Sequence, residues 1–301
     1  MRLDSQKSFN ILYAEDNIDE REYMASILEE NGHRVFFAEN GLIAKRELEA
    51  RGEEYDVVVS DVQMPEMDGL ALAQFNFETV YIPFVVTTNN RDADGALKFI
   101  KFGVQDYVLK PVHGTRFISI LRNSVLRKNS IPDNSDSSDI VWDGNLASME
   151  FPSTLEGVKN AGQWVRDRAK NLIPEKEMRI FSNNVYEFIV NAHEHGNMKV
   201  SESKKGVLLD DGEYSEYLEK MEKEIDAKLV LQMSILDNEI GVSISDQGEG
   251  FDFELYVGMT KYDLIKRLGL PNGRGIVMAK TYFDSVKYSN NGSSVRLTRI
   301  F

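Results

Sequence analysis

The chain contains 301 residues, 42% of them hydrophobic, with no cysteine and a formal net charge of −14. This length and apolar content predict two domains with ordinary cores, and the lack of cysteine excludes disulfides, thiolate metal sites and thiol catalysis. An excess of acidic residues argues against a nucleic-acid-binding protein, because such proteins need a basic surface. Since the sequence shows neither a signal peptide nor an apolar run of membrane-spanning length, we expect a cytoplasmic protein that does not bind membranes.

The first part of the chain alternates short apolar runs with helical spacing, which predicts a doubly wound α/β domain with a parallel sheet. We expect its five strands at residues 10–14, 35–38, 55–60, 82–87 and 104–109. The expected helices include a short third one at residues 70–77 and a last one whose apolar residues are Phe117, Ile120, Leu121, Val125 and Leu126. We expect this last helix to pack on its own sheet, and its continuation outward as a stalk is the alternative.

Reactive side chains stand at the carboxyl ends of these expected strands. Glu15 and Asp16 follow the first strand, Asp61 the third, Thr88 the fourth and Lys110 the fifth. In such sheets, ligands bind at the carboxyl ends of the strands. Three carboxylates this close would raise one another's pKa, and a bound cation removes the conflict. Because Mg²⁺ prefers hard oxygen ligands, the pattern predicts a magnesium site, although any one of these acids alone is equally well read as a loop residue or helix cap.

Three runs closely resemble the receiver domain of bacterial response regulators, and the resemblance extends over about residues 8–128. They are Ile11-Leu12-Tyr13-Ala14-Glu15-Asp16-Asn17, Asp61-Val62-Gln63-Met64-Pro65-Glu66-Met67-Asp68-Gly69 and Asp106-Tyr107-Val108-Leu109-Lys110-Pro111. The resemblance implies that Asp61 accepts a phosphoryl group and that Glu15 and Asp16, together with Asp61, hold Mg²⁺.

By the same resemblance, Lys110 and Thr88 bind the phosphoryl oxygens, and Tyr107 moves with Thr88 on activation. Asn89 departs from the family pattern, which usually has a small residue at this position. An upstream histidine kinase or phosphotransfer protein is the implied partner.

A polar segment rich in serine and aspartate separates the two halves of the chain. Its composition predicts a linker, since it offers no apolar surface to bury. The expected organisation is a receiver domain at residues 1–128, a linker at 129–145 and a second domain at 146–301.

The second domain contains a predicted amphipathic helix that spans residues 183–197. Its expected buried stripe consists of Phe181, Val185, Phe188, Ile189 and Ala192. On the opposite side, spacings of three or four residues place these polar side chains in one line: Asn184, Glu187, Asn191 and His195. A polar ligand such as Mg²⁺ would explain this line, and a merely hydrated helix face is the alternative.

Glycines follow a predicted strand at residues 240–246. Asp246 shares the parity of the buried strand residues and is followed by Gly248 and Gly250. Further along, Gly273, Arg274 and Gly275 precede an apolar run that we expect to begin a helix. Glycine lets backbone approach a ligand closely, and a helix N-terminus after glycine binds phosphate, although each pair alone is also explained by a turn.

In this order, the motifs resemble the Bergerat-type (GHKL) ATPase fold of histidine kinases, gyrase and Hsp90-like proteins over residues 146–301. They are most similar to the anti-sigma-factor serine kinase branch, to which His195-Gly196-Asn197 points. The resemblance implies an α/β sandwich that binds ATP and Mg²⁺, with Asn191 on the metal, Asp246 on the adenine amino group and Glu187 as general base. His195, Arg274 and the glycines at 248, 250, 273 and 275 would frame the nucleotide.

Two features of this domain lie outside the motifs. Residues 214–225 show helical spacing, and we expect this helix to pack on its own domain, with a homodimer or partner surface as the alternative. Asn291-Gly292 predicts a tight turn between two strands of a terminal hairpin.

The leading hypothesis is a response regulator whose output domain is a serine-protein kinase of the partner-switching type. Its targets would be an anti-sigma-factor antagonist-like protein or a sigma factor. A histidine kinase is disfavoured, because the four histidines lie in the receiver or in the nucleotide motif and the linker leaves no room for a dimerising hairpin. The alternative from another class is a non-catalytic module that holds ATP and sequesters a partner.

Overall fold

The computed structural model describes residues 8–89, 98–99, 102–104, 106–129, 145–211, 213–254 and 274–301. The chain divides into two compact units, Met1–Asn129 and Ser130–Phe301. Residues 130–144 of the predicted linker at 129–145 and the predicted nucleotide-site residue Gly273 lie outside the described residues. None of the helices in these ranges combines the length and the hydropathy that crossing a membrane requires.

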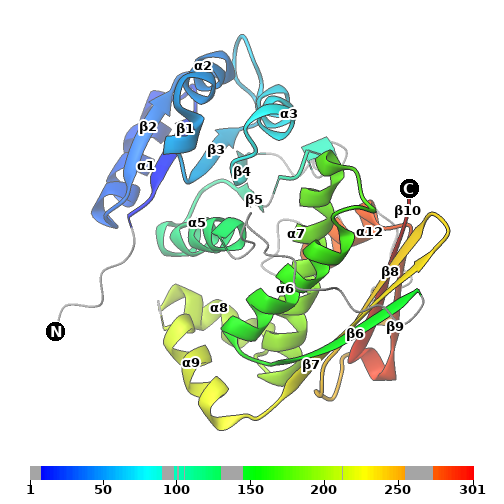
Figure 1. Cartoon of the computed structure of the whole chain (residues 1–301). Coiled ribbons are helices and arrows are strands. Elements are labelled where there is room, and N and C mark those ends of the chain that lie inside the picture. The colour runs from blue at the N-terminus through cyan, green and yellow to red at the C-terminus, as the bar shows by residue number, and fades with distance from the viewer. Residues whose placement is uncertain are drawn as a thin grey trace. The chain divides into compact units, whose positions relative to one another are not determined.

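The first unit is built on a five-stranded sheet in which every neighbouring pair is parallel and the order is β2-β1-β3-β4-β5 (Figure 1). Its strands are β1 (Asn10–Ala14), β2 (Arg34–Ala38), β3 (Val57–Asp61), β4 (Phe84–Thr88) and β5 (Asp106–Leu109). The predicted doubly wound parallel sheet is therefore confirmed. Asp61 is the last residue of β3, at the carboxyl end of the strand as expected.

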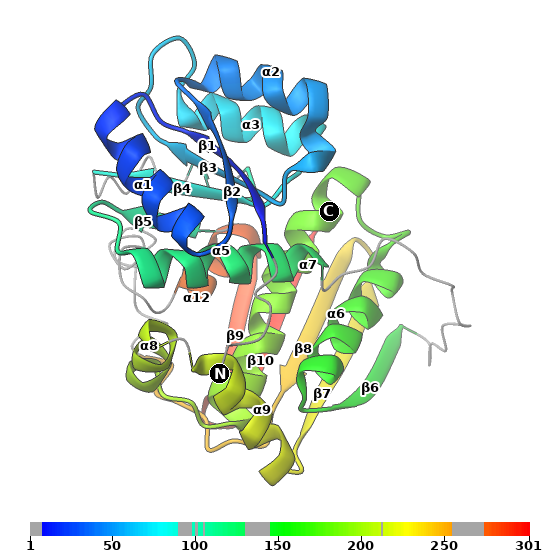
Figure 2. The same cartoon turned by 90° about the vertical axis from the view of Figure 1, so that its left-hand side faces the viewer.

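Helices cover both faces of this sheet, α1 and α5 one face and α2 and α3 the other (Figure 2). They are α1 (Ile18–Glu30), α2 (Gly41–Arg51), α3 (Gly69–Thr79) and α5 (Gly114–Asn129), with a short 3₁₀ turn at Gly52–Glu54. Phe117, Leu121 and Val125 of α5 pack in one core with Ile11 and Val57, so this helix packs on its own sheet as predicted.

The second unit is built on a five-stranded antiparallel sheet in the order β6-β7-β8-β10-β9 (Figure 1). Its strands are β6 (Leu146–Pro152), β7 (Lys228–Leu236), β8 (Glu239–Ser245), β9 (Ser285–Ser289) and β10 (Ser294–Ile300). Leu229, Leu231 and Met233 alternate along β7 and are fully buried. The alternation places every second side chain on the one face that helices cover.

That face packs against α6 (Leu155–Ala169), α7 (Glu175–Asn191) and α12 (Arg274–Tyr282), as Figure 1 shows. The predicted stripe of α7 is buried in this core: Phe181, Val185, Phe188, Ile189 and Ala192. The unit is thus an α/β sandwich of one helical layer and one sheet, as expected for a GHKL-type domain.

Between α7 and β7 the chain forms two further helices, α8 (Glu202–Asp210) and α9 (Tyr214–Glu224). Tyr214 and Leu218 of α9 pack in a small separate core against Met198 and Val200, which follow α7. The expectation that this helix packs on its own domain is confirmed.

The turn of the terminal hairpin differs from the prediction. Ser289 pairs with Ser294, so four residues connect β9 to β10, and the tight turn expected at Asn291-Gly292 is wrong. Residues Asn290–Gly292 form a 3₁₀ turn instead. The reason is a tertiary contact, because the backbone N–H of Phe251 donates to the carbonyl of Asn291 over 2.9 Å and the connection accommodates this neighbouring loop.

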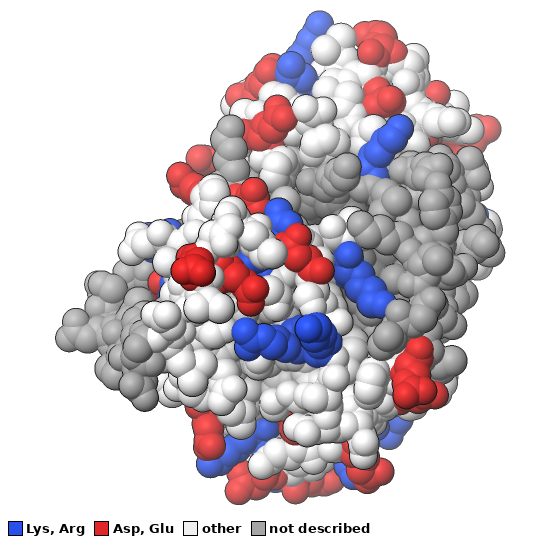
Figure 3. Space-filling model, turned by 90° about the vertical axis from the view of Figure 1, so that its right-hand side faces the viewer, with Lys and Arg blue, Asp and Glu red and all other residues white. Residues whose placement is uncertain are grey.

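Charge is distributed without strong segregation on the face drawn in Figure 3. Blue basic and red acidic side chains are interspersed among uncharged atoms, and the described part of this face shows no broad basic surface. This distribution agrees with the acidic net charge of −14 and gives no electrostatic footprint for nucleic acid there.

Candidate functional site

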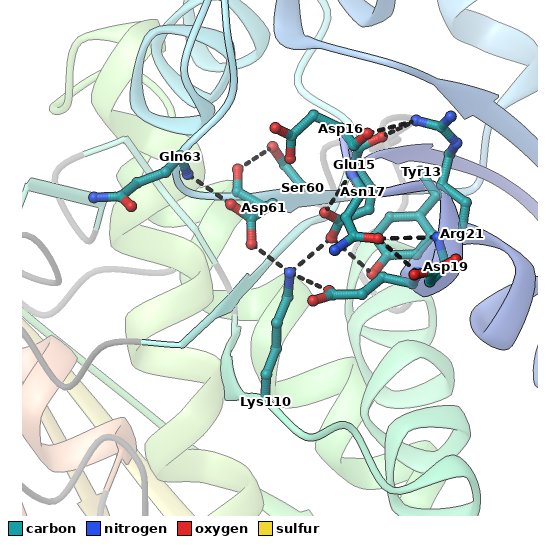
Figure 4. Close-up of polar contacts among 11 residues, drawn as sticks. Tyr13, Glu15, Asp16, Asn17, Asp19, Arg21, Ser60, Asp61, Gln63 and Lys110 are labelled. Atoms are coloured by element: carbon teal, nitrogen blue, oxygen red, sulfur yellow. Dashed lines mark hydrogen bonds and ion pairs between the residues drawn. The ribbon is translucent and has the colours of Figure 1, made fainter.

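The first candidate site lies at the carboxyl ends of β1, β3 and β5, where four charged side chains meet (Figure 4). We call this group the acid cluster; it consists of Glu15, Glu20, Asp61 and Lys110. Glu15 follows β1, Asp61 ends β3 and Lys110 follows β5. The parallel sheet brings these strand ends to one edge, so the cluster forms where the sequence predicts it.

The Lys110 ammonium is the centre of the acid cluster. Its Nζ lies 2.7 Å from Oε2 of Glu15 and 2.6 Å from Oδ1 of Asp61, and it also pairs with Glu20. Only 7% of the Lys110 side chain is exposed, compared with 1% for Glu15 and 10% for Asp61. Burial tends to lower the pKa of Lys110, yet its carboxylate hydrogen bonds outweigh this and raise that pKa above its ordinary value.

Further contacts fix the two central carboxylates. Oδ2 of Asp61 accepts the backbone N–H of Gln63 over 2.7 Å, and Oε1 of Glu15 accepts that of Asn17 over 3.3 Å. Burial raises the pKa of Glu15, while the Lys110 ammonium opposes this rise. The Lys110 ammonium thus favours the charged form of the buried Glu15 carboxylate.

The acid cluster fits Mg²⁺ by its donor chemistry. Glu15 and Asp61 both contact the Lys110 ammonium, so their oxygens already share one positive charge. Carboxylate oxygens are also the ligands that Mg²⁺ prefers. Among the described residues no three acidic or histidine side chains are arranged around a common metal position, and Asp16 is exposed. Holding Mg²⁺ would therefore require Asp16 to turn toward the other two carboxylates and Lys110 to shift.

Two other predicted residues lie on the strands beside the cluster. Thr88 ends β4 and is buried, and Tyr107 lies on the neighbouring strand β5. Val86, two residues before Thr88, pairs with Tyr107 in the strand register. The sheet therefore places the hydroxyl and the aromatic ring on adjacent strands, as the predicted coupling between them needs.

Sequence reasoning missed Glu20, the fourth member of the acid cluster. The signal was present, because Asn17 is the N-cap of α1 and its side chain accepts from the backbone N–H groups of Asp19 and Glu20. This cap places Glu20 in the first turn of α1, a few residues after the end of β1.

The second candidate site surrounds Asp246, which follows β8. We call Gly196, Asn197, Asp246 and Gly248 the Asp246 cluster. The backbone N–H of Gly248 donates to Oδ1 of Asp246 over 2.8 Å, and in the described part of the chain Oδ2 accepts no hydrogen bond. Burial raises the pKa of Asp246 to about 6. A half-buried carboxylate with an unused oxygen is an acceptor available to a ligand.

Glycines make the Asp246 cluster sterically possible. A Cβ atom on Gly196 would overlap the carboxyl group of Asp246, and one on Gly248 would lie 2.5 Å from the carbonyl oxygen of Gly196. The two glycines thus let the end of α7 and the loop after β8 approach each other at backbone distance. Gly250 has another role, since its φ of +80° and its contact with the Asn291 backbone suit the hairpin connection.

Asn197 holds the parts of this cluster together and was also missed as a functional residue. Its Oδ1 accepts the backbone N–H of Gln247 over 2.8 Å. Its Nδ2 donates to Oγ of Ser153 over 2.8 Å and to the carbonyl of Lys228 over 3.0 Å. One buried carboxamide therefore joins the loop after β8 to the end of β6 and the start of β7.

The helix that carries the polar line does not remain α-helical to its end. Ala192–Asn197 form a π-helical segment, whose hydrogen bonds span five residues rather than four. The predicted polar line from Glu187 through Asn191 to His195 therefore passes from an α-helical into a π-helical register after Asn191. Nδ1 of His195 lies 2.5 Å from the carbonyl oxygen of Val200 and is engaged in fixing the following segment.

Glu187 and Asn191 remain on the α-helical part and are half-buried. Among the described residues, the Asn191 carboxamide has no hydrogen-bond partner, so its oxygen is available to a ligand. Arg274 and Gly275 form the first turn of α12, as predicted. Gly273, which precedes them, lies outside the described residues.

His193, the other histidine of this motif, is a structural residue. It is 1% exposed, and its Nδ1 lies 3.0 Å from Oγ of Ser153. Burial lowers the pKa of His193, which favours its neutral imidazole. Such a ring is inaccessible to a phosphoryl donor, which agrees with the argument against a histidine kinase.

Comparison with known proteins assigns both units. Residues 11–122 match the response regulator receiver domain, and residues 151–299 match the histidine kinase-like ATPase domain. The chain therefore joins a response regulator receiver domain to a histidine kinase-like ATPase domain.

Individual relatives are similar over part of their length. The transcriptional regulatory protein ZraR of Klebsiella oxytoca is 32% identical over 109 residues, which are 36% of this chain and 24% of that protein. Two-component system protein A of Emericella nidulans is 32% identical over 114 residues, 37% of this chain and 17% of that protein. The chain thus spans less than a quarter of the length of either relative.

Among solved structures, the receiver domain of a signal transduction histidine kinase from Syntrophus aciditrophicus is 27% identical, with a TM-score of 0.38. The match covers 44% of this chain and 98% of that one.

Proposed function

We propose that this protein is a two-component response regulator in which phosphorylation of Asp61 controls an ATP-dependent serine-protein kinase of the partner-switching type. One observation carries the proposal: a single chain joins a carboxylate clamped by a buried lysine to a half-buried acceptor carboxylate held between glycines. The first arrangement suits a phosphoryl group, and the second suits the amino group of adenine.

At the receiver, the partner is a histidine kinase or a phosphotransfer protein. A carboxylate oxygen of Asp61 forms the new P–O bond while the P–N bond of the phosphohistidine breaks and its electron pair stays on the imidazole. Mg²⁺, held by Glu15, Asp16 and Asp61, would neutralise charge on the phosphoryl group. Lys110 and Thr88 then donate hydrogen bonds to the phosphoryl oxygens.

At the second site, Asp246 accepts a hydrogen bond from the adenine amino group, and Gly248, Gly250 and the start of α12 line the nucleotide. The oxygen of Asn191 would hold the Mg²⁺ that accompanies the phosphates. Glu187 removes the proton from the serine hydroxyl of an antagonist-like protein while the serine oxygen bonds to the γ-phosphorus of ATP. The bond between that phosphorus and the bridging oxygen breaks, and ADP leaves with the electron pair. Binding to a sigma factor would carry the output to transcription.

The input half is tested with a small-molecule phosphodonor and Mg²⁺. We expect an acid-labile phosphate on the wild-type chain and none on Asp61→Asn. Asp56→Asn is the matched control, because this carboxylate lies just before β3 at the opposite end of the strand and accepts the backbone N–H of Asn10. Phosphate that persists on Asp61→Asn contradicts the assignment.

The output half is tested with labelled ATP and candidate antagonist proteins. We expect label on a partner serine that disappears with Glu187→Ala and persists with Glu175→Ala, an exposed carboxylate on the same helix. ATP binding by calorimetry without transfer to any partner would instead establish a non-catalytic module that sequesters its partner. Absence of ATP binding would exclude both functions.

A further inference from the structure

Glu20 gives the acid cluster a carboxylate that lies outside the predicted phosphorylation residues. It stands in the first turn of α1, where Asn17 caps the helix and accepts the Glu20 backbone N–H over 3.3 Å. Its carboxylate pairs directly with the Lys110 ammonium. The cap fixes the helix, so this contact is part of the resting structure of the receiver.

The contact with Glu20 occupies one of the hydrogen-bond donors of Lys110. A lysine ammonium has three N–H groups. Lys110 directs them to Glu15, Glu20 and Asp61, so none remains for a phosphoryl oxygen. One of these three bonds must break before Lys110 can donate to a new oxyanion.

Exposure indicates which bond breaks. The Glu20 side chain is 34% exposed, whereas Glu15 is 1% and Asp61 10% exposed. A carboxylate at the solvent boundary regains water when it leaves the ammonium, and a buried one does not. Glu20 is therefore the partner that Lys110 releases at the lowest cost.

We propose that Glu20 is a positioning residue that competes with the incoming phosphoryl group for Lys110 and so sets how readily the receiver is phosphorylated. The proposal rests on the assignment of Asp61 as phosphoacceptor. Glu20 holds the ammonium toward α1 in the resting receiver, and its negative charge also repels an approaching oxyanion. Both effects act in the same direction, so removing the Glu20 carboxylate favours the phosphorylated state.

The experiment titrates the full-length chain with beryllofluoride, a stable mimic of a phosphoryl group on aspartate, in the presence of Mg²⁺. We expect Glu20→Gln to lower the dissociation constant about three- to fivefold, the upper part of the range for a partly exposed ion pair. Asp19→Asn is the matched control, because it removes the same charge from the same helical turn, and Asp19 is exposed and makes no ion pair with Lys110. We expect its affinity to stay within about twofold of the wild type.

A second variant separates contact from general charge. Glu20→Asp keeps the negative charge but shortens the side chain, so it loses reach to Lys110. If the contact matters, Glu20→Asp binds beryllofluoride nearly as tightly as Glu20→Gln. A merely structural role of Glu20 would weaken binding in both variants and lower their thermal unfolding midpoints.

Three results would overturn the inference. If wild type and Glu20→Gln bind beryllofluoride with equal affinity, Glu20 does not compete for Lys110. If Glu20→Asp binds it with wild-type affinity, the effect of Glu20 comes from its negative charge and not from its contact with Lys110. Weaker Mg²⁺ binding by Glu20→Gln without beryllofluoride would assign Glu20 to the metal instead. If the wild type binds beryllofluoride no better than Asp61→Asn, the Asp61 assignment fails and this inference falls with it.

Discussion

The carboxylates of the two candidate sites differ in their partners. In the acid cluster, the buried carboxylates of Glu15 and Asp61 share the Lys110 ammonium as an internal counter-ion. In the Asp246 cluster, a half-buried carboxylate has one hydrogen bond, from the backbone N–H of Gly248, and none of the ion pairs among the described residues includes it.

This difference indicates how each site responds to its ligand. The receiver must exchange existing ion pairs for new ones, so ligand binding there alters contacts that hold α1, β3 and β5 together. The Asp246 cluster has an acceptor ready for a neutral donor and needs no exchange. A site that exchanges internal partners is suited to switching, and a preformed acceptor is suited to binding.

The largest effect is expected from removing the Lys110 ammonium, the internal counter-ion of the acid cluster. Lys110→Ala leaves buried carboxylates without a cation, and we expect the receiver's free energy of unfolding to fall by about 3 to 5 kcal/mol. Hydrogen exchange of the β3 amides in the full chain measures this locally, and added Mg²⁺ should restore protection. Lys45→Ala, which removes an exposed ion pair with Glu49, is the control and should leave exchange unchanged. Unaltered protection in Lys110→Ala would show that the carboxylates need no counter-ion.

The Asp246 acceptor can be disturbed by adding a methyl group at Gly196, which lies against its carboxyl group. In Gly196→Ala the new methyl group overlaps the Asp246 carboxyl group, and we expect ATP affinity to fall about a hundredfold, or about 2.7 kcal/mol. Calorimetry with a non-hydrolysable ATP analogue measures the loss. The matched control is Gly206→Ala in α8, where a Cβ meets no atom within 4 Å. If both variants bind equally well, the nucleotide does not contact this cluster.

A milder test loosens the Asp246 cluster without entering it. Asn197→Ala removes three hydrogen bonds and strands the N–H of Gln247, which we expect to lower the stability of the second unit by about 2 kcal/mol. Amide exchange of β8 should accelerate while that of the receiver strands stays constant. Asn238→Ala, which loses one exposed hydrogen bond to the Phe301 carbonyl, serves as the comparison. Equal protection in both variants would contradict the anchoring role.

The smallest expected effect is the pH dependence of nucleotide binding. Because burial raises the pKa of Asp246 to about 6, its carboxylate is protonated below that pH and no longer accepts well. ATP affinity at about pH 5 should be about tenfold lower than at neutral pH. Asp246→Asn should bind weakly at every pH without this slope.

The same group has a predictable sign in stability. The folded state favours protonated Asp246, so its contribution is fully present below the unfolded pKa of about 4 and is lost as the pH rises through about 6. Thermal unfolding across this range should show a decline that Asp246→Asn lacks. An increase in stability over the same range would mean that a partner stabilises the charged carboxylate.

The sequence by itself determined both folds and which charged side chains meet at the edge of the receiver sheet. Apolar runs such as Val57-Val58-Val59 and the alternation of Leu229, Leu231 and Met233 predict buried strands, because burial on one or two faces dictates those patterns. Since parallel strands end at one edge, the meeting of Glu15, Asp61 and Lys110 followed from their positions at the carboxyl ends of predicted strands.

Only the tertiary structure decided how these residues are partnered. The Asn17 cap places Glu20 in the first turn of α1, but only the fold brings its carboxylate to Lys110. Asn197 likewise joins three elements distant in sequence. The π-helical register at Ala192–Asn197 and the contact of His195 with the Val200 carbonyl were also not predicted, because hydrogen-bond register near a helix end depends on packing. Periodicity reports which face of an element is buried, whereas long-range contacts between polar groups depend on distances that exist only in the folded chain.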